Sequence, residues 1–188
     1  PAGDLRDIRN SSKRAQLIIV TECPEALSPD ERSSIIRELN PFPDQKVYFT
    51  KINYGIPYHL FSREKKVPDS QLDVLLVCGI ANPAPLKQVL TLHFSPYEML
   101  AFRDHHIFNS DDLKEIKKHF TKIEGENKMI ITTEKDGVRL AKFENELEQL
   151  PIYVFPISHQ FLFDEATAFE KDVSGFIERF GLIKSTNR

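Results

Sequence analysis

The chain has 188 residues, enough for one large domain or one and a half small ones, and enough to bury a sizeable core. Its 25 Lys and Arg against 28 Asp and Glu give a net charge of -3 with the two signs interspersed. This balance argues against a protein that holds nucleic acid by neutralising phosphates, so no nucleic-acid partner is expected. The longest apolar run, 74–81, is far shorter than the roughly 18 residues of a membrane span, so nothing is expected to cross a bilayer.

The first residues and the glycines suggest a piece of a longer protein. The chain opens at Pro1 without a signal-peptide pattern. Its seven glycines are too scattered to form GxGxxG or GxxxxGK[ST], so any phosphate-binding loop is expected outside this chain. Cys23 and Cys78 lie at or just after apolar runs and belong to no CxxC or Cys/His spacing. They predict buried thiols in a reducing compartment, and they argue against a zinc ribbon.

Short β-branched runs alternate with amphipathic stretches along the chain. The first run predicts a parallel strand buried on both faces. Strands are expected at 16–21, 46–51, 73–79, 99–103, 129–132 and 152–155. Helices are expected from Ser28 to about Asn40, from Asn82 onward, over 110–123, over 133–141, and from Thr167 to a stop at Gly181. Between them, 52–72 carries a glycine and two prolines and predicts a hairpin or interdomain linker.

About six strands alternating with about five helices predict an α/β fold, with a mainly parallel sheet, flanking helices and functional residues at the carboxyl ends of strands. Three polar clusters follow predicted strands directly. They are Gly79-Ile80-Ala81-Asn82-Pro83, Asp104-His105-His106 and Thr132-Thr133-Glu134-Lys135-Asp136. Their shared position makes all three candidates for a site.

Each cluster has a functional and a purely structural interpretation. The first is either part of a site or a strand-to-helix turn in which Asn82 caps the helix. In the second, a carboxylate next to histidine can fix its tautomer and strengthen it as a base, so one histidine is expected to be catalytic and the other to support it. The third is either an anion-binding helix start or a well-capped helix with solvated charges.

Together these clusters resemble the C-terminal half of the tetraacyldisaccharide 4′-kinase (lipid A 4′-kinase) family of Gram-negative bacteria. Four motifs carry the resemblance, in the family's order: Pro1-Ala2-Gly3 with Leu5-Arg6; Gly79 to Pro83; Phe102 with Asp104-His105-His106 and Phe108; and Ile131 to Asp136 with Leu140. One departure follows the Leu-Arg pair, where many members have Glu and this chain has Asp7.

The resemblance implies a P-loop-kinase-like fold whose P-loop half is absent here. Residues 1–51 would continue the N-terminal kinase domain, 52–72 would form a hairpin linker, and 73–188 would form a C-terminal α/β domain. The implied reaction transfers the γ-phosphate of ATP to the 4′-hydroxyl of a tetraacylated glucosamine disaccharide 1-phosphate. ATP and Mg²⁺ would be bound mainly by the absent half. The enzyme would be a peripheral protein at the cytoplasmic face of the inner membrane. This chain alone is expected to be inactive.

The resemblance also implies roles for particular residues. His105 is expected to handle the proton of the attacking hydroxyl together with a carboxylate of the absent half, and Asp104 to orient the loop. Asp7 would be the metal-site group. Substrate- or nucleotide-binding roles fall to Arg6, Asn82, Thr133, Glu134 and Lys135.

Two other functions stay open at this point. The Asp-His-His run also occurs in a class of manganese phosphoesterases, although that chemistry needs further close aspartates and the chain has no Asp-x-Asp. The second alternative is a non-catalytic fragment that docks on a partner or a lipid surface.

Overall fold

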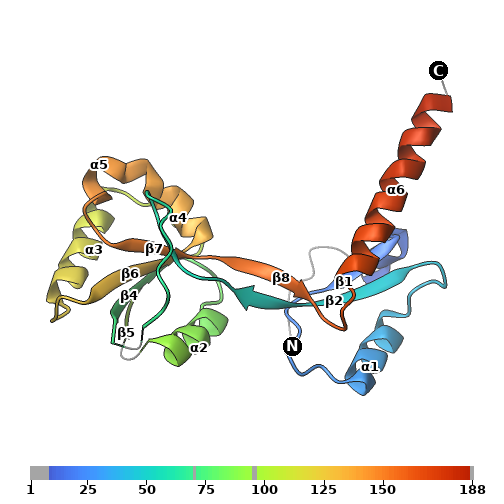
Figure 1. Ribbon diagram of the computed structural model, residues 1–188, viewed down its shortest axis with the longest axis horizontal. Coiled ribbons are helices and arrows are strands. Elements are labelled where there is room, and N and C mark those ends of the chain that lie inside the picture. The colour runs from blue at the N-terminus through green and yellow to red at the C-terminus, as the bar shows by residue number, and fades with distance from the viewer. Residues whose placement is uncertain (1–8, 70, 95–96, 187–188) are drawn as a thin grey trace. The chain divides into compact units, whose positions relative to one another are not determined.

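The computed structural model describes residues 9–69, 71–94 and 97–186, which form two compact units (Figure 1). The first comprises the chain up to Asn53 together with the chain from His159 onward, and the second comprises Tyr54–Ser158. The expected boundaries were wrong in two places: 54–69 belongs to the second unit and is no linker, and the last helix belongs to the first unit. The reason is strand pairing, because β8 (Ile157–Phe161) brings the chain back alongside β2 (Lys46–Tyr54).

The sheet of the first unit has the order β1-β2-β8. β1 (Leu17–Val20) runs parallel to β2, with Leu17 opposite Lys46 and Val20 opposite Phe49, which confirms the expected parallel strand. Its expected burial on both faces was wrong, since Ile19 is 43% exposed. Strand β8 was not predicted from the sequence, because its polar residues lack the apolar alternation of a half-buried strand.

Three helical segments accompany this sheet: η1 (Arg9–Arg14), α1 (Pro29–Leu39) and α6 (Ala166–Thr186). The predicted capping box of α1 is confirmed: the Glu31 amide donates to Ser28 Oγ at 3.3 Å, and the Ser28 amide donates to Glu31 Oε2 at 2.8 Å. The predicted stop at Gly181 was wrong, because α6 continues to Thr186 with Gly181 inside it. Among the described residues, no helix has both the length and the apolar character needed to span a membrane.

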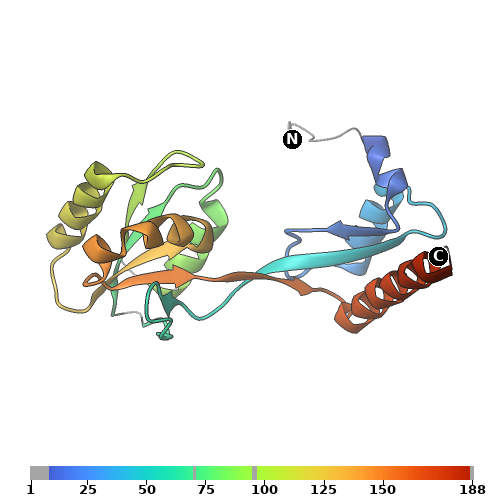
Figure 2. The same ribbon diagram turned by 90° about the horizontal axis from the view of Figure 1, so that it is seen from above.

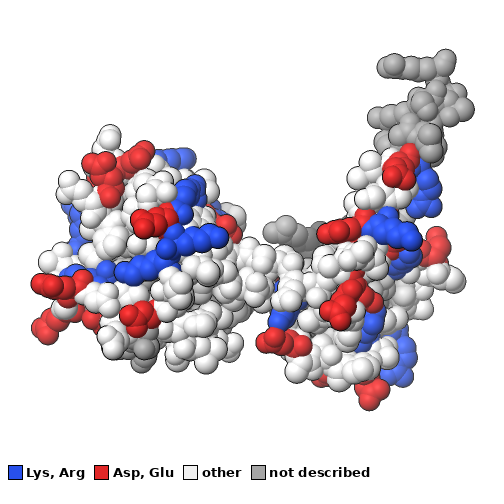
Figure 3. All heavy atoms as spheres, in the orientation of Figure 1, with Lys and Arg blue, Asp and Glu red and all other residues white. Residues whose placement is uncertain are grey.

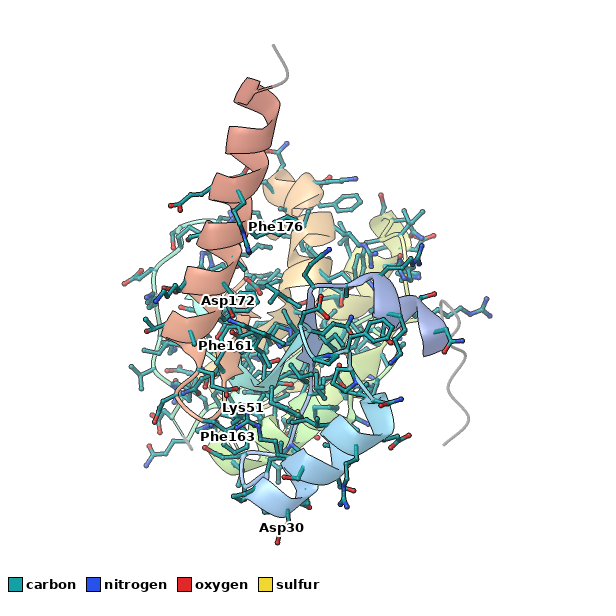
Figure 4. The ribbon with its side chains drawn as sticks, turned by 90° about the vertical axis from the view of Figure 1, so that its right-hand side faces the viewer. Asp30, Lys51, Phe161, Phe163, Asp172 and Phe176 are labelled. Carbon is teal, nitrogen blue, oxygen red and sulfur yellow. The ribbon has the colours of Figure 1, made fainter. Side chains whose placement is uncertain are left out.

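Helix α6 is held to the sheet by aromatic packing and by one carboxylate (Figure 4). Phe169 packs edge-on against Tyr48, with ring centroids 5.2 Å apart, and lies 4.7 Å from the ring of Phe161. Asp172 accepts hydrogen bonds from the Tyr48 hydroxyl and the Lys46 ammonium. Burial, followed by the hydrogen bond to Asp172, raises the pKa of Tyr48 to about 12.

The raised pKa of Tyr48 predicts a loss of stability in alkali. Between the ordinary tyrosine pKa of about 10 and about 12, the unfolded chain releases a proton that the folded chain keeps, so the free energy of unfolding falls as pH rises through this window. Denaturant unfolding followed from pH 9 to 12 should show this decline, and Tyr48→Phe should reduce it. Tyr58→Phe, a change in the second unit, is the control. An equal decline in both variants would contradict the prediction.

The sheet of the second unit has the order β3-β7-β6-β4-β5. Its strands are β3 (Tyr58–His59), β4 (Asp73–Cys78), β5 (Tyr97–Ala101), β6 (Lys128–Thr133) and β7 (Ile152–Phe155). The β4–β5, β4–β6 and β6–β7 pairs are parallel, and β3 runs antiparallel to β7. The chain is thus an α/β protein in which parallel pairs predominate and the sheets are mixed.

Helices cover both faces of this sheet (Figures 1 and 2). Alternate residues of β4 point to opposite sides: Leu75 and Val77 belong to one apolar cluster, and Val74 and Leu76 belong to the other. The first cluster includes side chains of α3 (Ser110–Lys122), α4 (Glu134–Leu140) and α5 (Glu144–Leu147), and the second includes those of α2 (Ala84–His93). A short η2 (Ala141–Phe143) joins α4 to α5. The expected parallel-sheet core is therefore confirmed.

The segment that was expected to be a linker contributes to this core instead. Tyr58 and His59 pair with Val154 and Tyr153 of β7, and Tyr58 also bridges to Lys65. Leu60 is buried in the same cluster as the α3 side chains. The bridge between Tyr58 and Lys65 is the hairpin-like contact that was expected, but its strand β3 forms the edge of the sheet.

Candidate functional site

The three polar clusters lie at one edge of the second unit's sheet. β4, β5 and β6 are adjacent and parallel, so the turns that follow them meet at their carboxyl ends. Two contacts join the turns directly: the Gly79 amide donates to Asp136 Oδ2 at 2.8 Å, and Lys135 Nζ donates to Asp104 Oδ1 at 3.0 Å. This is the edge at which open parallel sheets bind ligands.

Asp104, His105 and Lys135 form a solvent-exposed cluster, here called the His105 cluster. The His105 side chain is 73% exposed, with its Nε2 3.6 Å from Asp104 Oδ2 and 3.5 Å from Lys135 Nζ. The hydrogen bond from Lys135, aided by the charges of His105 and Lys135, lowers the pKa of Asp104. The cluster therefore presents an imidazole to solvent between a carboxylate and an ammonium group.

His106 turns away from this cluster and is part of the scaffold. Its ring stacks on Phe102 at 4.7 Å and meets Phe108 edge-on at 5.2 Å. Its Nε2 lies 2.9 Å from Oδ2 of Asp112, which also accepts the Asn109 amide in the capping box of α3. His106 is thus packed while His105 is exposed, and the division of a catalytic and a supporting role between them stays a prediction.

Asp136 was missed as a site residue, although it organises the edge. Its side chain is fully buried, and it accepts hydrogen bonds from the Gly79 amide, from Thr133 Oγ1 at 2.9 Å and from Arg139 Nη1 at 3.2 Å. Thr133 Oγ1 in turn accepts the Asp136 amide as the cap of α4. The sequence signal was the third position after the capping threonine, where a carboxylate closes a capping box; here the carboxylate bonds the turn that follows β4 instead.

The remaining predicted binding residues have mixed placements. Asn82 Oδ1 accepts the Ala84 amide at 3.2 Å, so it supports the first turn of α2, as the structural interpretation expects, while Pro83 takes the cap position. Glu134 Oε2 accepts the Ile157 amide at 3.3 Å. Arg6 and Asp7 lie outside the described residues.

A pocket of about 320 Å³ opens beside Lys135. Its walls are mostly apolar and come from the carboxyl ends of β4, β6 and β7 and from the end of β2. The lining residues are Tyr54, Ile80, Leu86, Thr133, Glu134, Lys135, Phe155 and Ile157. Sequence reasoning missed Tyr54, which fell in the predicted hairpin or linker, and Phe155, which ended a predicted strand. Their rings pack 5.3 Å apart.

The described residues provide no cation site at this edge. Over 9–69, 71–94 and 97–186, no three His, Cys, Asp or Glu side chains come together as metal ligands. The two nearby aspartates are already matched with cations, Asp104 with Lys135 and Asp136 with Arg139. These residues therefore do not fit Mg²⁺ or Mn²⁺, and no step is assigned to a metal on them.

Both charge signs occur on the visible face of each unit (Figure 3).

A helix-flanked parallel sheet with an exposed imidazole, a carboxylate and an ammonium group at its carboxyl edge defines an α/β domain of the ligand-binding type. Comparison with known proteins gives the family. The LpxK model, described as tetraacyldisaccharide-1-P 4′-kinase, matches residues 1–178, so the chain belongs to this family.

Curated relatives agree with this assignment. The chain is 37% identical to the tetraacyldisaccharide 4′-kinase of Bacteroides thetaiotaomicron, with 94% of this chain and 50% of that protein covered. It is 35% identical to the enzyme of the same name from Flavobacterium johnsoniae, with 87% and 47% covered. The chain thus spans about half the length of the curated relatives it matches.

One solved structure shows the same fold. LpxK from Aquifex aeolicus, crystallised in complex with ATP, superposes with a TM-score of 0.56 at 15% sequence identity, covering 95% of this chain and 47% of that one. At this identity the likeness concerns the fold alone.

Proposed function

We propose that this chain is the C-terminal part of a kinase that transfers the γ-phosphate of ATP to the 4′-hydroxyl of tetraacyldisaccharide 1-phosphate, a precursor of lipid A. The observation that carries the proposal is the His105 cluster at the carboxyl edge of the sheet, in a chain of the tetraacyldisaccharide 4′-kinase family. The similar structure from Aquifex aeolicus was crystallised with ATP, which supports ATP as the donor.

His105 is proposed to handle the proton of the attacking hydroxyl. In phosphoryl transfer, the hydroxyl oxygen forms a bond to the γ-phosphorus, the bond to the leaving ADP oxygen breaks, and the hydroxyl proton must leave. Whichever ring nitrogen of neutral His105 lacks a proton has a lone pair that can take the hydroxyl proton, and the ring is exposed to solvent beside Asp104 and Lys135. Such a ring can accept the proton directly or assist a carboxylate supplied by the absent half.

Lys135 and the adjoining pocket are proposed to bind substrate. The ammonium group stands at the rim of a pocket with apolar walls, so a ligand can place an apolar part inside and an anionic phosphate against the lysine. Asp104 would hold the side chains of Lys135 and His105 next to each other through its contacts with both. Arg6, Asp7, Asn82, Thr133 and Glu134 stay proposed as neighbouring binding groups.

The absent half is proposed to supply ATP, Mg²⁺ and the phosphate-binding loop. Neither GxGxxG nor GxxxxGK[ST] occurs in these 188 residues, and the chain covers half of its relatives. The complete enzyme is proposed to work at the cytoplasmic face of the inner membrane, where its lipid substrate lies. Within this scheme the chain's own contribution is the proton-handling and substrate-contacting edge.

A transfer assay tests the proposed function. The complete protein should move labelled γ-phosphate from ATP to tetraacyldisaccharide 1-phosphate, and this chain alone should not, because it has no phosphate-binding loop. The phosphorylated lipid is measured by chromatography. Turnover by this chain alone, or a complete protein that lacks transfer activity, would contradict the proposal.

A further inference from the structure

We infer that Asp136 is a positioning residue for His105 and Lys135, acting through the turn at Gly79. The inference rests on the proposed function, because it assigns Asp136 a role in placing the groups proposed to act there. Asp136 itself is fully buried, so its effect must pass through the groups that it bonds.

The first step is the bond network of the carboxylate. Oδ2 accepts from the Gly79 amide and from Thr133 Oγ1, and Oδ1 accepts from Arg139. A buried carboxylate is tolerated only with such partners, and charge-assisted bonds are stronger than neutral ones. The network therefore joins the turn after β4 firmly to the start of α4.

The second step leads from Gly79 to the turn that carries His105. A Cβ built on Gly79 would lie 3.0 Å from the Arg103 carbonyl oxygen and 3.3 Å from His106 Cβ. The backbone at Gly79 is thus in direct contact with residues 103–106. A shift of Gly79 away from the Asp136 carboxylate would therefore also shift the 103–106 turn.

The third step concerns the reacting groups themselves. His105 has a φ of 60°, in the left-handed region that non-glycine residues seldom adopt. Its exposed side chain has little packing to hold it, so its location depends on the backbone of the turn, which is closed by the His106 amide donating to the Arg103 carbonyl at 3.1 Å. Lys135 immediately precedes Asp136 in the chain, so the bonds of the Asp136 carboxylate also hold the backbone from which the Lys135 side chain extends.

The test compares variants of the complete protein. Asp136→Ala removes every acceptor, whereas Asp136→Asn keeps one oxygen for the Gly79 amide and the Thr133 hydroxyl. Arg139→Met alone would leave the buried carboxylate without its cation, so it is combined with Asp136→Asn; this double variant can keep both of those bonds, leaves no buried charge unpaired, and is the matched control. Gly79→Ala leaves Asp136 intact but pushes on the 103–106 turn, and it substitutes for Asp136→Ala if that variant does not fold.

Two readouts separate positioning from general stability. Amide hydrogen exchange should accelerate at His106 and Phe102 in Asp136→Ala, with exchange at Leu75 in central β4 unchanged. kcat should fall by about 10- to 100-fold with the KM for ATP little changed, since a displacement of about 1 Å costs up to about 100-fold. Asp136→Asn, alone or combined with Arg139→Met, should stay within a few-fold of the unsubstituted protein.

The unfavourable outcomes are distinct. Unchanged exchange at His106, or a uniform rise across the second unit, would overturn the inference, and so would faster exchange at the turn with an unchanged kcat. Failure of His105→Ala to lower kcat would instead overturn the proposed role of His105, whatever the exchange shows.

Discussion

Replacing His105 with alanine in the complete enzyme is expected to lower kcat by about 100- to 10,000-fold, the range that general-base assistance contributes. This corresponds to about 3 to 5 kcal/mol of activation free energy. The physical reason is the position of the imidazole: it is exposed, and it lies between Asp104 and Lys135. Steady-state phosphate transfer to the lipid acceptor measures the effect.

The matched control is His93→Ala, since His93 is an exposed histidine in the last turn of α2. It should leave kcat within a few-fold of the unsubstituted enzyme. His106→Ala is no substitute for this control, because its ring packs between Phe102 and Phe108 and its loss would disturb the turn. A His105→Ala enzyme that retains kcat within a few-fold would remove His105 from the mechanism.

Replacing Lys135 with methionine is expected to lower kcat/KM by about 100- to 1000-fold, the loss typical when one preorganised group that stabilises developing charge is removed. Methionine keeps most of the length of the side chain and removes the ammonium group. The hydrogen bond to Asp104 is lost as well, so the pKa of Asp104 should rise toward its ordinary value. Kinetics with the lipid acceptor and with ATP, each varied in turn, measure the effect.

Lys135→Arg restores the positive charge with a different shape, and it should recover part of the activity. The control is Lys142→Met, which removes an exposed lysine from η2. Equal activities of Lys135→Met and Lys142→Met would show that the charge at position 135 takes no part in the reaction.

The two rival functions fare differently. A manganese phosphoesterase needs several metal ligands in one place, and within the described ranges the nearby aspartates are paired with Lys135 and Arg139 while His106 is bonded to Asp112. Membership of the tetraacyldisaccharide 4′-kinase family points the same way. A non-catalytic docking role is separated from the kinase role by the His105 and Lys135 variants, since docking alone would not make turnover depend on them.

Local signals in the sequence were enough to locate most elements. The Ser28 and Asn109 capping boxes, the β-branched run at 129–132 and the apolar run at 73–78 all became the expected helices and strands. These features depend on neighbours within a few residues, so the sequence contains nearly all of the information that they need. The polar clusters follow β4, β5 and β6 as predicted, for the same reason, whereas the parallel pairing of these strands is a long-range property.

Long-range pairing could not be predicted in this way. Strand β8 has a polar pattern and forms because β2 is available as a partner, and α6 extends past Gly181, where the backbone stays helical. The segment 54–69 resembled a linker because its prolines and glycine are typical of one, yet Leu60 is buried in the core. For β8 and for 54–69, propensity is overridden by contacts between residues far apart in the chain.

The sequence by itself determined the α/β class, the three polar turns and the family resemblance, because these depend on residue type and spacing. Only the tertiary structure decided which histidine is exposed, since a left-handed backbone at His105 and an aromatic setting for His106 turn two adjacent rings apart. The tertiary structure also decided that Asp136 joins the turn after β4 to the start of α4, because the Gly79 amide from which it accepts a hydrogen bond lies 57 residues away in the chain. Capping is local, whereas a buried carboxylate finds its partners only in the folded sheet.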